Sequence, residues 1–187
     1  MAKRIFDFLF AFFLLIVLLP LLVLVVVAIQ VDSRGPAIFK QTRIGQHNKP
    51  FTIYKFRTMK TDTPDVATDQ LQNPSHFVTR LGHMLRKTSI DELPQLLNIL
   101  KGDMSFVGPR PALYNQYELI KRRTEQHVDR LLPGLTGYAQ INGRDDISDE
   151  DKIKLDSEYV NIAGFWMDMK IIVKTIYLAA VSRGVKG

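Results

Sequence analysis

The run FLFAFFLLIVLLPLLVLVVVAI, from Phe8 to Ile29, is apolar throughout and decides how the rest of the chain is organised. At about 1.5 Å per residue, such a helix matches a hydrocarbon core of about 30 Å. A cleaved signal peptide is disfavoured, because the run is long and Ala28-Ile29-Gln30 is a poor small-residue cleavage site. A buried helix that is apolar on every side would be unusually long for a soluble core. The sequence therefore predicts a membrane-embedded helix in residues 1–34.

Pro20 lies in the middle of this run and predicts that the helix is broken there. The segment on each side of Pro20 is roughly 15–18 Å long, enough for one leaflet. Lys3 and Arg4 precede the run and Arg34 follows it, and cations on both sides favour entry and exit on the cytoplasmic face. A re-entrant hairpin is the favoured interpretation, and a kinked helix that spans the bilayer is the alternative. Asp7 is expected to meet Arg4 on one helix face near the headgroups.

The composition of the chain narrows the classes of partner and site. There are 25 Lys+Arg against 19 Asp+Glu, for a formal net charge of +6. This basic excess suits nucleic acid, anionic lipid or a phosphorylated substrate. The absence of cysteine excludes disulfides and thiolate metal sites, and the four histidines lack metal-ligand spacing.

The remainder, residues 35–187, has the composition of a soluble globular domain and predicts a mostly helical α+β fold with a short β element. Alternating apolar residues in Phe51–Met59 predict a strand, and the polar segment Thr61–Ser75 predicts a loop. The helices expected from periodicity are His76–Arg86, Leu93–Leu100, Leu113–Arg130, Asp149–Tyr159 and Trp166–Val181, with an irregular segment at Pro133–Gly143. The last helix presents either a core face or an amphipathic surface on the membrane, and the second is favoured.

The segment RKTSIDELP, from Arg86 to Pro94, carries the adjacent carboxylates Asp91 and Glu92. One explanation is structural, because Ser89 followed three residues later by Glu92 matches a helix capping box. The other is catalytic, because cations gather around the pair in the sequence. Arg86 lies just upstream, and Lys55 and Arg57 lie on the predicted strand.

Two further segments favour phosphate chemistry. Arg110 lies between Pro109 and Pro111, which pre-orients a guanidinium for bidentate phosphate binding. The segment QINGR, Gln140 to Arg144, adds polar donors on a flexible backbone. Carboxylates and arginines together suit an anionic substrate with Mg²⁺.

Three long motifs resemble the bacterial sugar transferase family, and more narrowly its small monotopic phosphoglycosyl transferases. They are KFRTM (Lys55–Met59), SIDELPQLLNILKGDMSFVGPRP (Ser89–Pro111) and PGLTGYAQINGR (Pro133–Arg144). The resemblance implies a re-entrant N-terminal helix, an Asp-Glu dyad, Mg²⁺ and a cytoplasmic active site at the membrane surface. Many members of this family have Ser before the membrane proline, whereas this chain has Leu19.

The resemblance also assigns roles to individual residues. The dyad corresponds to Asp91 and Glu92, with Asp91 as the expected nucleophile and Mg²⁺ ligand. Glu92 either binds metal or positions the acceptor. The groups expected to bind substrate or support its site are Lys55, Arg57, Arg86, Arg110, Gln140, Arg144 and Asp168.

The implied reaction moves a phosphosugar from a UDP-sugar, expected to be an N-acetylated hexosamine, to undecaprenyl phosphate through an aspartyl intermediate. The implied location is the cytoplasmic face of the bacterial inner membrane, among membrane lipid, and a homodimer is left open. A membrane-tethered nucleic-acid or lipid-binding module and a membrane phosphatase are the alternatives. Nucleic acid is not expected as a partner, because base-stacking aromatic platforms are absent from the sequence.

Overall fold

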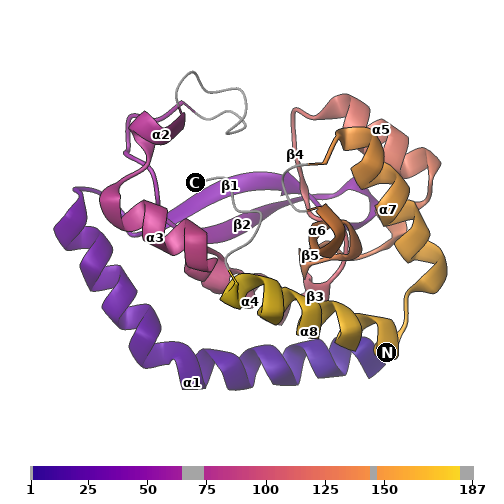
Figure 1. Cartoon of the computed structure of the whole chain (residues 1–187), viewed down its shortest axis with the longest axis horizontal. Helices are drawn as coiled ribbons and strands as arrows, with labels where there is room; N and C mark the ends of the chain where they lie inside the picture. The colour runs from indigo at the N-terminus through magenta and orange to yellow at the C-terminus, as the bar shows by residue number, and fades with distance from the viewer. Residues whose placement is uncertain (1, 65–73, 144–146, 182–187) are drawn as a thin grey trace.

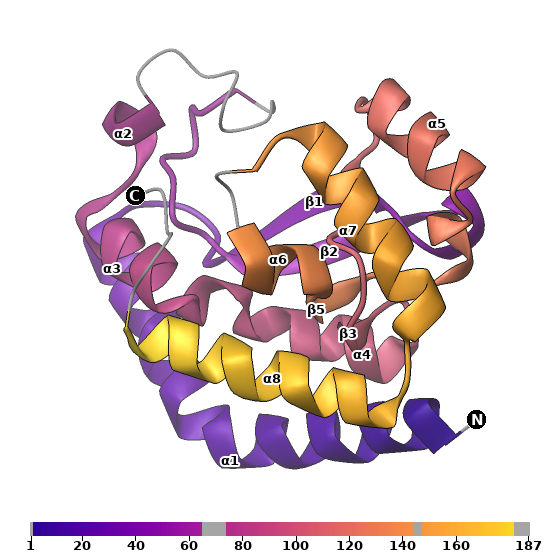
Figure 2. The same cartoon turned by 45° about the vertical axis from the view of Figure 1, so that its right-hand side comes forward.

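A computed structural model describes residues 2–64, 74–143 and 147–181 (Figure 1). The first helix, α1 (Ala2–Asp32), runs along one side of the molecule. The helices α3 (Arg80–Thr88), α4 (Leu96–Lys101) and α8 (Phe165–Ala180) lie next to it, and the longest strands lie beyond these helices (Figures 1 and 2).

The other elements are short. The remaining helices are α2 (Pro74–Phe77), α5 (Tyr117–Glu125), α6 (Tyr138–Gly143) and α7 (Asp149–Ile162), with 3₁₀ turns η1 (Gln46–Asn48), η3 (Ile90–Gln95) and η4 (Val128–Arg130). The strands are β1 (Ile38–Ile44), β2 (Pro50–Phe56), β3 (Ser105–Val107), β4 (Ala112–Leu113) and β5 (Gly134–Thr136). The predicted fold class, mostly helical α+β, is confirmed.

Two small sheets organise the strands. The first has the order β2-β1-β4, and β1 pairs antiparallel with both neighbours. In the second, β3 and β5 run parallel, with Ser105 opposite Gly134 and Val107 opposite Thr136. Because β3 precedes the segment Gly108–Pro111 and β5 precedes α6, the second sheet joins the two motif-bearing segments of the chain.

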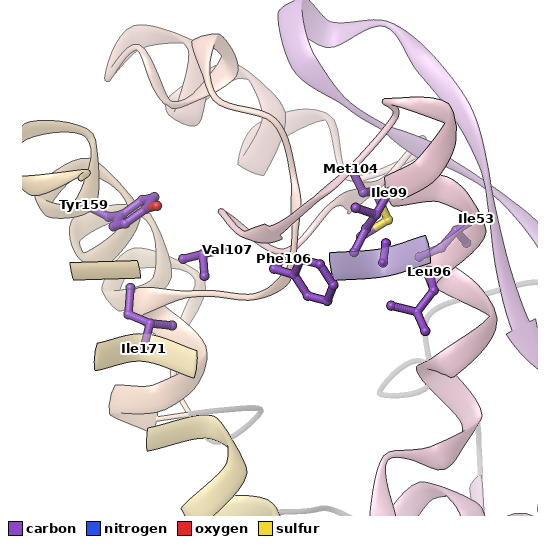
Figure 3. Close-up of a cluster of buried hydrophobic side chains, with 9 residues drawn as sticks. Ile53, Leu96, Ile99, Met104, Phe106, Val107, Tyr159 and Ile171 are labelled. Atoms are coloured by element: carbon purple, nitrogen blue, oxygen red, sulfur yellow. The ribbon is translucent and has the colours of Figure 1, made fainter. Parts of the chain in front are cut away.

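One hydrophobic cluster holds α1, the strands and the last two helices together (Figure 3). Its buried members are Ala11, Ile53, Leu96, Ile99, Met104, Phe106, Val107, Tyr159 and Ile171. Burying each large side chain of this kind contributes roughly 1.5–3 kcal/mol. A second cluster, built around Val25, Ile29 and Leu85, packs the other end of α1 against α3. The N-terminal helix is therefore an integral part of the packed structure.

The backbone of α1 stays helical through Pro20 and is not interrupted there, contrary to the predicted break. A proline removes one hydrogen bond and crowds one carbonyl, which bends a helix without ending it. Figure 1 shows α1 changing direction along its length. Residues before Pro20, such as Leu14 and Leu18, pack on the first cluster, whereas Leu22 and Val25 pack on the second.

Within the described ranges, α1 is the one helix long and apolar enough to cross a membrane. Only 11% of its most apolar window is buried by the rest of the protein. Most of its apolar side chains therefore face outward, which a soluble core helix would not tolerate.

The structure corrects several predicted elements. Leu113–Arg130 is not one helix, because Leu113 belongs to β4 and α5 covers only Tyr117–Glu125. Pro133–Gly143 is not irregular, since it forms β5 and α6. Both errors arise because short strands and turns depend on partners distant in sequence. Most of the predicted loop Thr61–Ser75 lies outside the described residues.

Candidate active site

The geometry of Asp91 and Glu92 begins with the end of α3. Ser89 adopts a left-handed conformation with φ of 58° and ends that helix, its N–H donating to the Arg86 carbonyl. The 3₁₀ turn η3 starts at the next residue and places both carboxylates in its first turn. Two helices thus meet at Ser89, and the acidic pair follows the junction directly.

The Glu92 carboxylate faces two cations. Its Oε1 accepts a hydrogen bond from Lys55 Nζ at 2.7 Å and another from Arg110 Nη2 at 3.1 Å. The Ser89 side chain forms no capping hydrogen bond. The capping-box alternative is therefore wrong, because Glu92 is turned toward cations from two other segments.

Lys55 reaches Glu92 because β2 is fixed against α4. Asn98, fully buried on α4, donates to the Thr52 carbonyl at 2.7 Å and accepts from the Tyr54 N–H at 3.1 Å. A side-chain amide thus replaces a neighbouring strand at this edge of β2. The register of β2 relative to η3 and α4 follows from this contact.

Arg110 is presented by the segment Gly108–Pro111, which packs directly on the backbone that follows η4. A Cβ on Gly108 would lie 2.1 Å from the Leu132 carbonyl oxygen, and one on Gly137 would lie 2.1 Å from the Gly108 oxygen. Only glycine permits such close approach of two backbones. The glycines of the second and third motifs therefore set the position of Arg110 relative to Glu92.

The charges in this cluster shift one another's proton affinities. Burial raises the pKa of Asp91 to about 6, and the charge of Glu92 adds to the rise. The cations that oppose it are Lys55, Arg86 and Arg110. For Glu92 burial also acts upward, but Lys55 and Arg110 outweigh it and lower its pKa to about 2. At neutral pH both carboxylates are therefore ionised, and Asp91 is the one close to titration.

Arg86 belongs to this cluster from the side of α3. Its Nε donates to the Thr58 hydroxyl at 3.0 Å, and its charge acts on the Asp91 carboxylate. The prediction that Lys55, Arg86 and Arg110 gather around the acidic pair agrees with the structure. Asp91 itself is 8% exposed, so solvent reaches it only to a small extent.

Arg57 is not at this site, contrary to the prediction. Its guanidinium donates to the Arg34 carbonyl at 2.9 Å and to the Ser33 carbonyl at 2.6 Å. These carbonyls directly follow α1, where the negative end of the helix dipole attracts a cation. Arg57 thus fixes the C-terminal end of α1 to the domain, a role that its sequence neighbourhood did not indicate.

Asp168 is also placed elsewhere. It pairs with Lys3 of α1, and its other oxygen accepts from the Tyr159 hydroxyl at 2.5 Å. Lys3 also donates to the Val107 carbonyl at 3.1 Å. Asp168 therefore joins α1, α7, α8 and the end of β3, and the structure assigns it to holding the fold together.

The expected contact between Arg4 and Asp7 is wrong as well. Arg4 donates to the carbonyls of Ile99 and Leu100, the latter at 2.8 Å, in the last turn of α4. The Asp7 carboxylate accepts from the Phe106 N–H at 3.3 Å. Each side chain contacts the domain instead of its neighbour, since carbonyls at the end of α4 lie opposite Arg4 and the Phe106 N–H lies opposite Asp7.

Gln140 lies on α6 near the Gly108 segment, and its contacts are local. Its Nε2 donates weakly to the Leu135 carbonyl at 3.4 Å, while Oε1 is buried without a hydrogen-bond partner. Substrate binding by Gln140 stays a prediction. Arg144 lies outside the described residues.

Comparison with known proteins agrees with these motifs. The sequence model of the family described as bacterial sugar transferase matches residues 1–182. The chain belongs to the bacterial sugar transferase family. The family predicted from the three motifs is therefore confirmed, and with it the conclusion that the chain is a transferase.

Three relatives illustrate the range of this family. The chain is 44% identical over 184 residues to the sugar transferase EpsL of Bacillus subtilis, covering 98% of this chain and 90% of EpsL. It is 44% identical over 194 residues to the undecaprenyl-phosphate glucose phosphotransferase of Komagataeibacter xylinus. It is 38% identical over 188 residues to the UDP-glucose:undecaprenyl-phosphate glucose-1-phosphate transferase of Escherichia coli. Each of the last two alignments covers 97% of this chain but only 36% and 40% of the longer relative, respectively.

The donor groups of this sugar transferase suit Mg²⁺ only in partnership with a substrate. Within 2–64, 74–143 and 147–181, no three His, Asp or Glu side chains form a metal-binding group. Mg²⁺ commonly takes one or two carboxylates and completes its shell with water and substrate phosphate oxygens. Asp91, a sheltered carboxylate with a raised pKa, fits that pattern, whereas Glu92 is already bound by two cations.

Sequence reasoning missed Asn98 as a residue that positions the site. The available signal was its place on the apolar segment Leu96–Leu100, where a buried amide needs hydrogen-bond partners. The pattern predicted a helix there but gave no indication that this amide would pair with β2.

Proposed function

We propose that this sugar transferase moves a sugar phosphate from a UDP-sugar to a polyprenyl phosphate and releases UMP. The observation that carries the proposal is the cluster of two carboxylates and three cations around η3. Lys55, Arg86 and Arg110 exceed Asp91 and Glu92 by one charge, which suits an anionic diphosphate. The activities for which the Komagataeibacter and Escherichia relatives are named support the same reaction class.

Asp91 is proposed as the nucleophile of a first displacement. One carboxylate oxygen attacks the phosphorus that bears the sugar, and the bond from that phosphorus to the bridging oxygen breaks, so UMP leaves with that oxygen. Burial of Asp91 leaves its charge poorly solvated, which favours attack. Arg110 and Lys55 would bind the donor's phosphate oxygens and stabilise the charge that develops on them.

In the second displacement, an oxygen of the polyprenyl phosphate attacks the same phosphorus. The bond to Asp91 breaks and the free carboxylate returns. Glu92 holds Lys55 and Arg110 together before the donor arrives, so both cations are in place at little cost on binding. When bound at Asp91, Mg²⁺ would supply further charge neutralisation of the diphosphate.

The proposal places the site at a membrane surface. α1 presents an exposed apolar surface, and α8 lies beside it in both views (Figures 1 and 2). α8 buries Ile171 in the core and exposes Trp166, Val173, Ile176 and Tyr177 on its other side. A helix with aromatic and aliphatic side chains on its outer surface suits the headgroup region. This surface would rest on the cytoplasmic leaflet and bring Asp91 to the depth of the acceptor's phosphate.

The activity is tested by UMP release from a panel of UDP-sugars with undecaprenyl phosphate and Mg²⁺ in detergent. UDP-glucose comes first in this panel, since these two relatives are named for the transfer of glucose or glucose-1-phosphate. The N-acetylated hexosamines predicted from the motifs come next. Formation of the lipid-linked sugar phosphate is the expected result. Release of UMP with transfer to water alone would identify a hydrolase and overturn the proposal.

The membrane topology is tested separately. The chain has no cysteine, so Ala2→Cys and Asp32→Cys each introduce a single label site at one end of α1. A re-entrant helix predicts that an impermeant thiol reagent labels neither site on intact cells and both after lysis. Labelling of one site from outside would establish a spanning helix.

A further inference from the structure

Arg123 and Asp156 form the most deeply buried ion pair among the pairs found in the described part of the chain. Arg123 Nη2 donates to Asp156 Oδ2 at 2.6 Å, and their side chains are 10% and 2% exposed. The pair joins α5 to α7, away from the acidic pair in sequence. A buried ion pair is weak evidence for stability, because desolvation offsets much of the attraction. Its presence is better explained by what the arginine holds.

The other terminal nitrogen of the Arg123 guanidinium binds the backbone that carries Arg110. Arg123 Nη1 donates to the Arg110 carbonyl oxygen at 2.8 Å. The carbonyls on either side are held too: Pro109 accepts from the Gly134 N–H at 2.9 Å, and Pro111 accepts from Arg43 Nη1 at 3.2 Å. Three consecutive carbonyls are therefore fixed from β5, α5 and β1.

The contact to the Arg110 carbonyl has a different role from the contacts to the carbonyls of Pro109 and Pro111. The prolines on both sides restrict φ, so the backbone conformation is already limited at 109 and 111. Arg110 lies between them and sends its side chain outward to Glu92, at 3.1 Å. The peptide group after Arg110 is fixed by Arg123, which is in turn oriented by Asp156.

We infer that Arg123 is a positioning residue that holds the Arg110 guanidinium in its phosphate-binding place, with Asp156 orienting Arg123. This inference rests on the proposed function only for its effect on turnover. A guanidinium suits the task because its planar fork donates to a carbonyl and a carboxylate at once. Arg123 itself contacts no substrate in this assignment, and it acts through Arg110.

The neighbouring residue offers a matched control. Arg122 lies on the same helix and pairs with Glu150 at 3.4 Å, with both side chains well exposed. Arg122→Met and Arg123→Met make the same chemical change at adjacent positions. We expect Arg123→Met to lower kcat/KM for UMP release about tenfold, as a small misplacement of a binding group does. Arg122→Met should stay within about twofold, as expected for a surface pair.

A double-mutant cycle separates positioning from general damage. If Arg123 acts through Arg110, Arg123→Met should cost less than about twofold in an Arg110→Ala background, although it costs about tenfold alone. Equal losses in both backgrounds would overturn the inference. Arg123→Lys provides a second variant if Arg123→Met fails to fold, and the same cycle with lysine decides the matter in the same way.

Hydrogen exchange of the full chain in detergent, without substrate, gives a readout independent of turnover. Amides in the segment Gly108–Leu113 should exchange faster in the Arg123 variant and not in the Arg122 variant. If the Arg123 variant exchanged faster but the wild-type protein turned over no UDP-sugar, the positioning role would be retained and the proposed function rejected. Unchanged exchange in the Arg123 variant would overturn the positioning role itself.

Discussion

Two clusters in the described part of the chain each bring a lysine to a carboxylate beside a third polar side chain, and they serve different purposes. In the Glu92 cluster, one carboxylate oxygen is shared by Lys55 and Arg110. In the Asp168 cluster, Lys3 takes one oxygen and the Tyr159 hydroxyl takes the other. The first cluster carries a net positive charge, whereas in the second both carboxylate oxygens accept hydrogen bonds.

Net charge distinguishes the binding cluster from the structural one. Burial and the hydrogen bond to Asp168 raise the pKa of Tyr159, so this hydroxyl remains a donor across the working pH range. Lys3 and Asp168 balance each other in charge, so this cluster carries no excess positive charge that would attract an anion. The cluster around Glu92 keeps a net positive charge and a partly exposed Arg110, so a phosphate can replace Glu92 as partner. Substitutions in the two clusters test this contrast.

Asp91→Asn should abolish turnover, with a fall in kcat of about 10³-fold or more, because an amide is a far weaker nucleophile. The fold should survive, since Asn suits the first turn of a helix nearly as well as Asp. Intact-protein mass after incubation with UDP-sugar and Mg²⁺ should show a phosphosugar adduct on the wild type and none on the variant. No adduct on turnover-competent wild type, with kinetics that require both substrates at once, would favour direct transfer.

Arg110→Lys should lower kcat/KM about 10–100-fold although the charge is kept. Lysine lacks the planar two-pronged donor geometry that suits a phosphate. The matched control is Lys101→Arg on α4, where the side chain donates to the Tyr54 hydroxyl on the exposed surface. Near-normal turnover of the Arg110 variant would reduce that residue to a general electrostatic contributor.

The dependence of kcat/KM on pH should have an acid limb near pH 6, since burial raises the pKa of Asp91 to about 6. The nucleophile must be ionised, so activity is retained above this pH and falls about tenfold for each unit below it. Glu92, with a pKa of about 2, stays ionised across this range. A limb near pH 4, with stability unchanged, would show that the pKa of Asp91 is not raised in the free enzyme.

Asp168→Asn should have the smallest effect on turnover, within about threefold per folded molecule. It should instead lower the free energy of unfolding by about 1–3 kcal/mol, because Lys3 loses its ionic partner. Tyr159→Phe, which removes the other hydrogen bond, should lower stability in the same direction. A fall in kcat of more than about 100-fold with unchanged melting would return Asp168 to the role that the sequence predicted for it, binding substrate or supporting the site.

Cations were predicted with mixed success, and the reason is geometric. Lys55 and Arg57 lie two residues apart at the end of the same strand, yet Lys55 faces Glu92 and Arg57 caps α1. Both residues are cations in the same short segment, so the local sequence does not show which one meets Glu92 and which one meets the end of α1. Which partner each one meets depends on where β2 ends relative to η3 and α1, and that is fixed by Asn98 and the long-range packing.

Sequence patterns alone predicted the apolar helix, the mostly helical α+β fold, the family, and the gathering of Asp91 and Glu92 with Lys55, Arg86 and Arg110. These features depend on continuous apolar runs, on adjacent residues and on long ordered motifs. The three-dimensional arrangement was needed to show that α1 continues through Pro20, that Arg57 and Asp168 hold the fold, and that Arg123 binds the backbone carbonyl of Arg110. These contacts join residues far apart in the chain through single hydrogen bonds. Their geometry follows from packing, for which local sequence carries no signal.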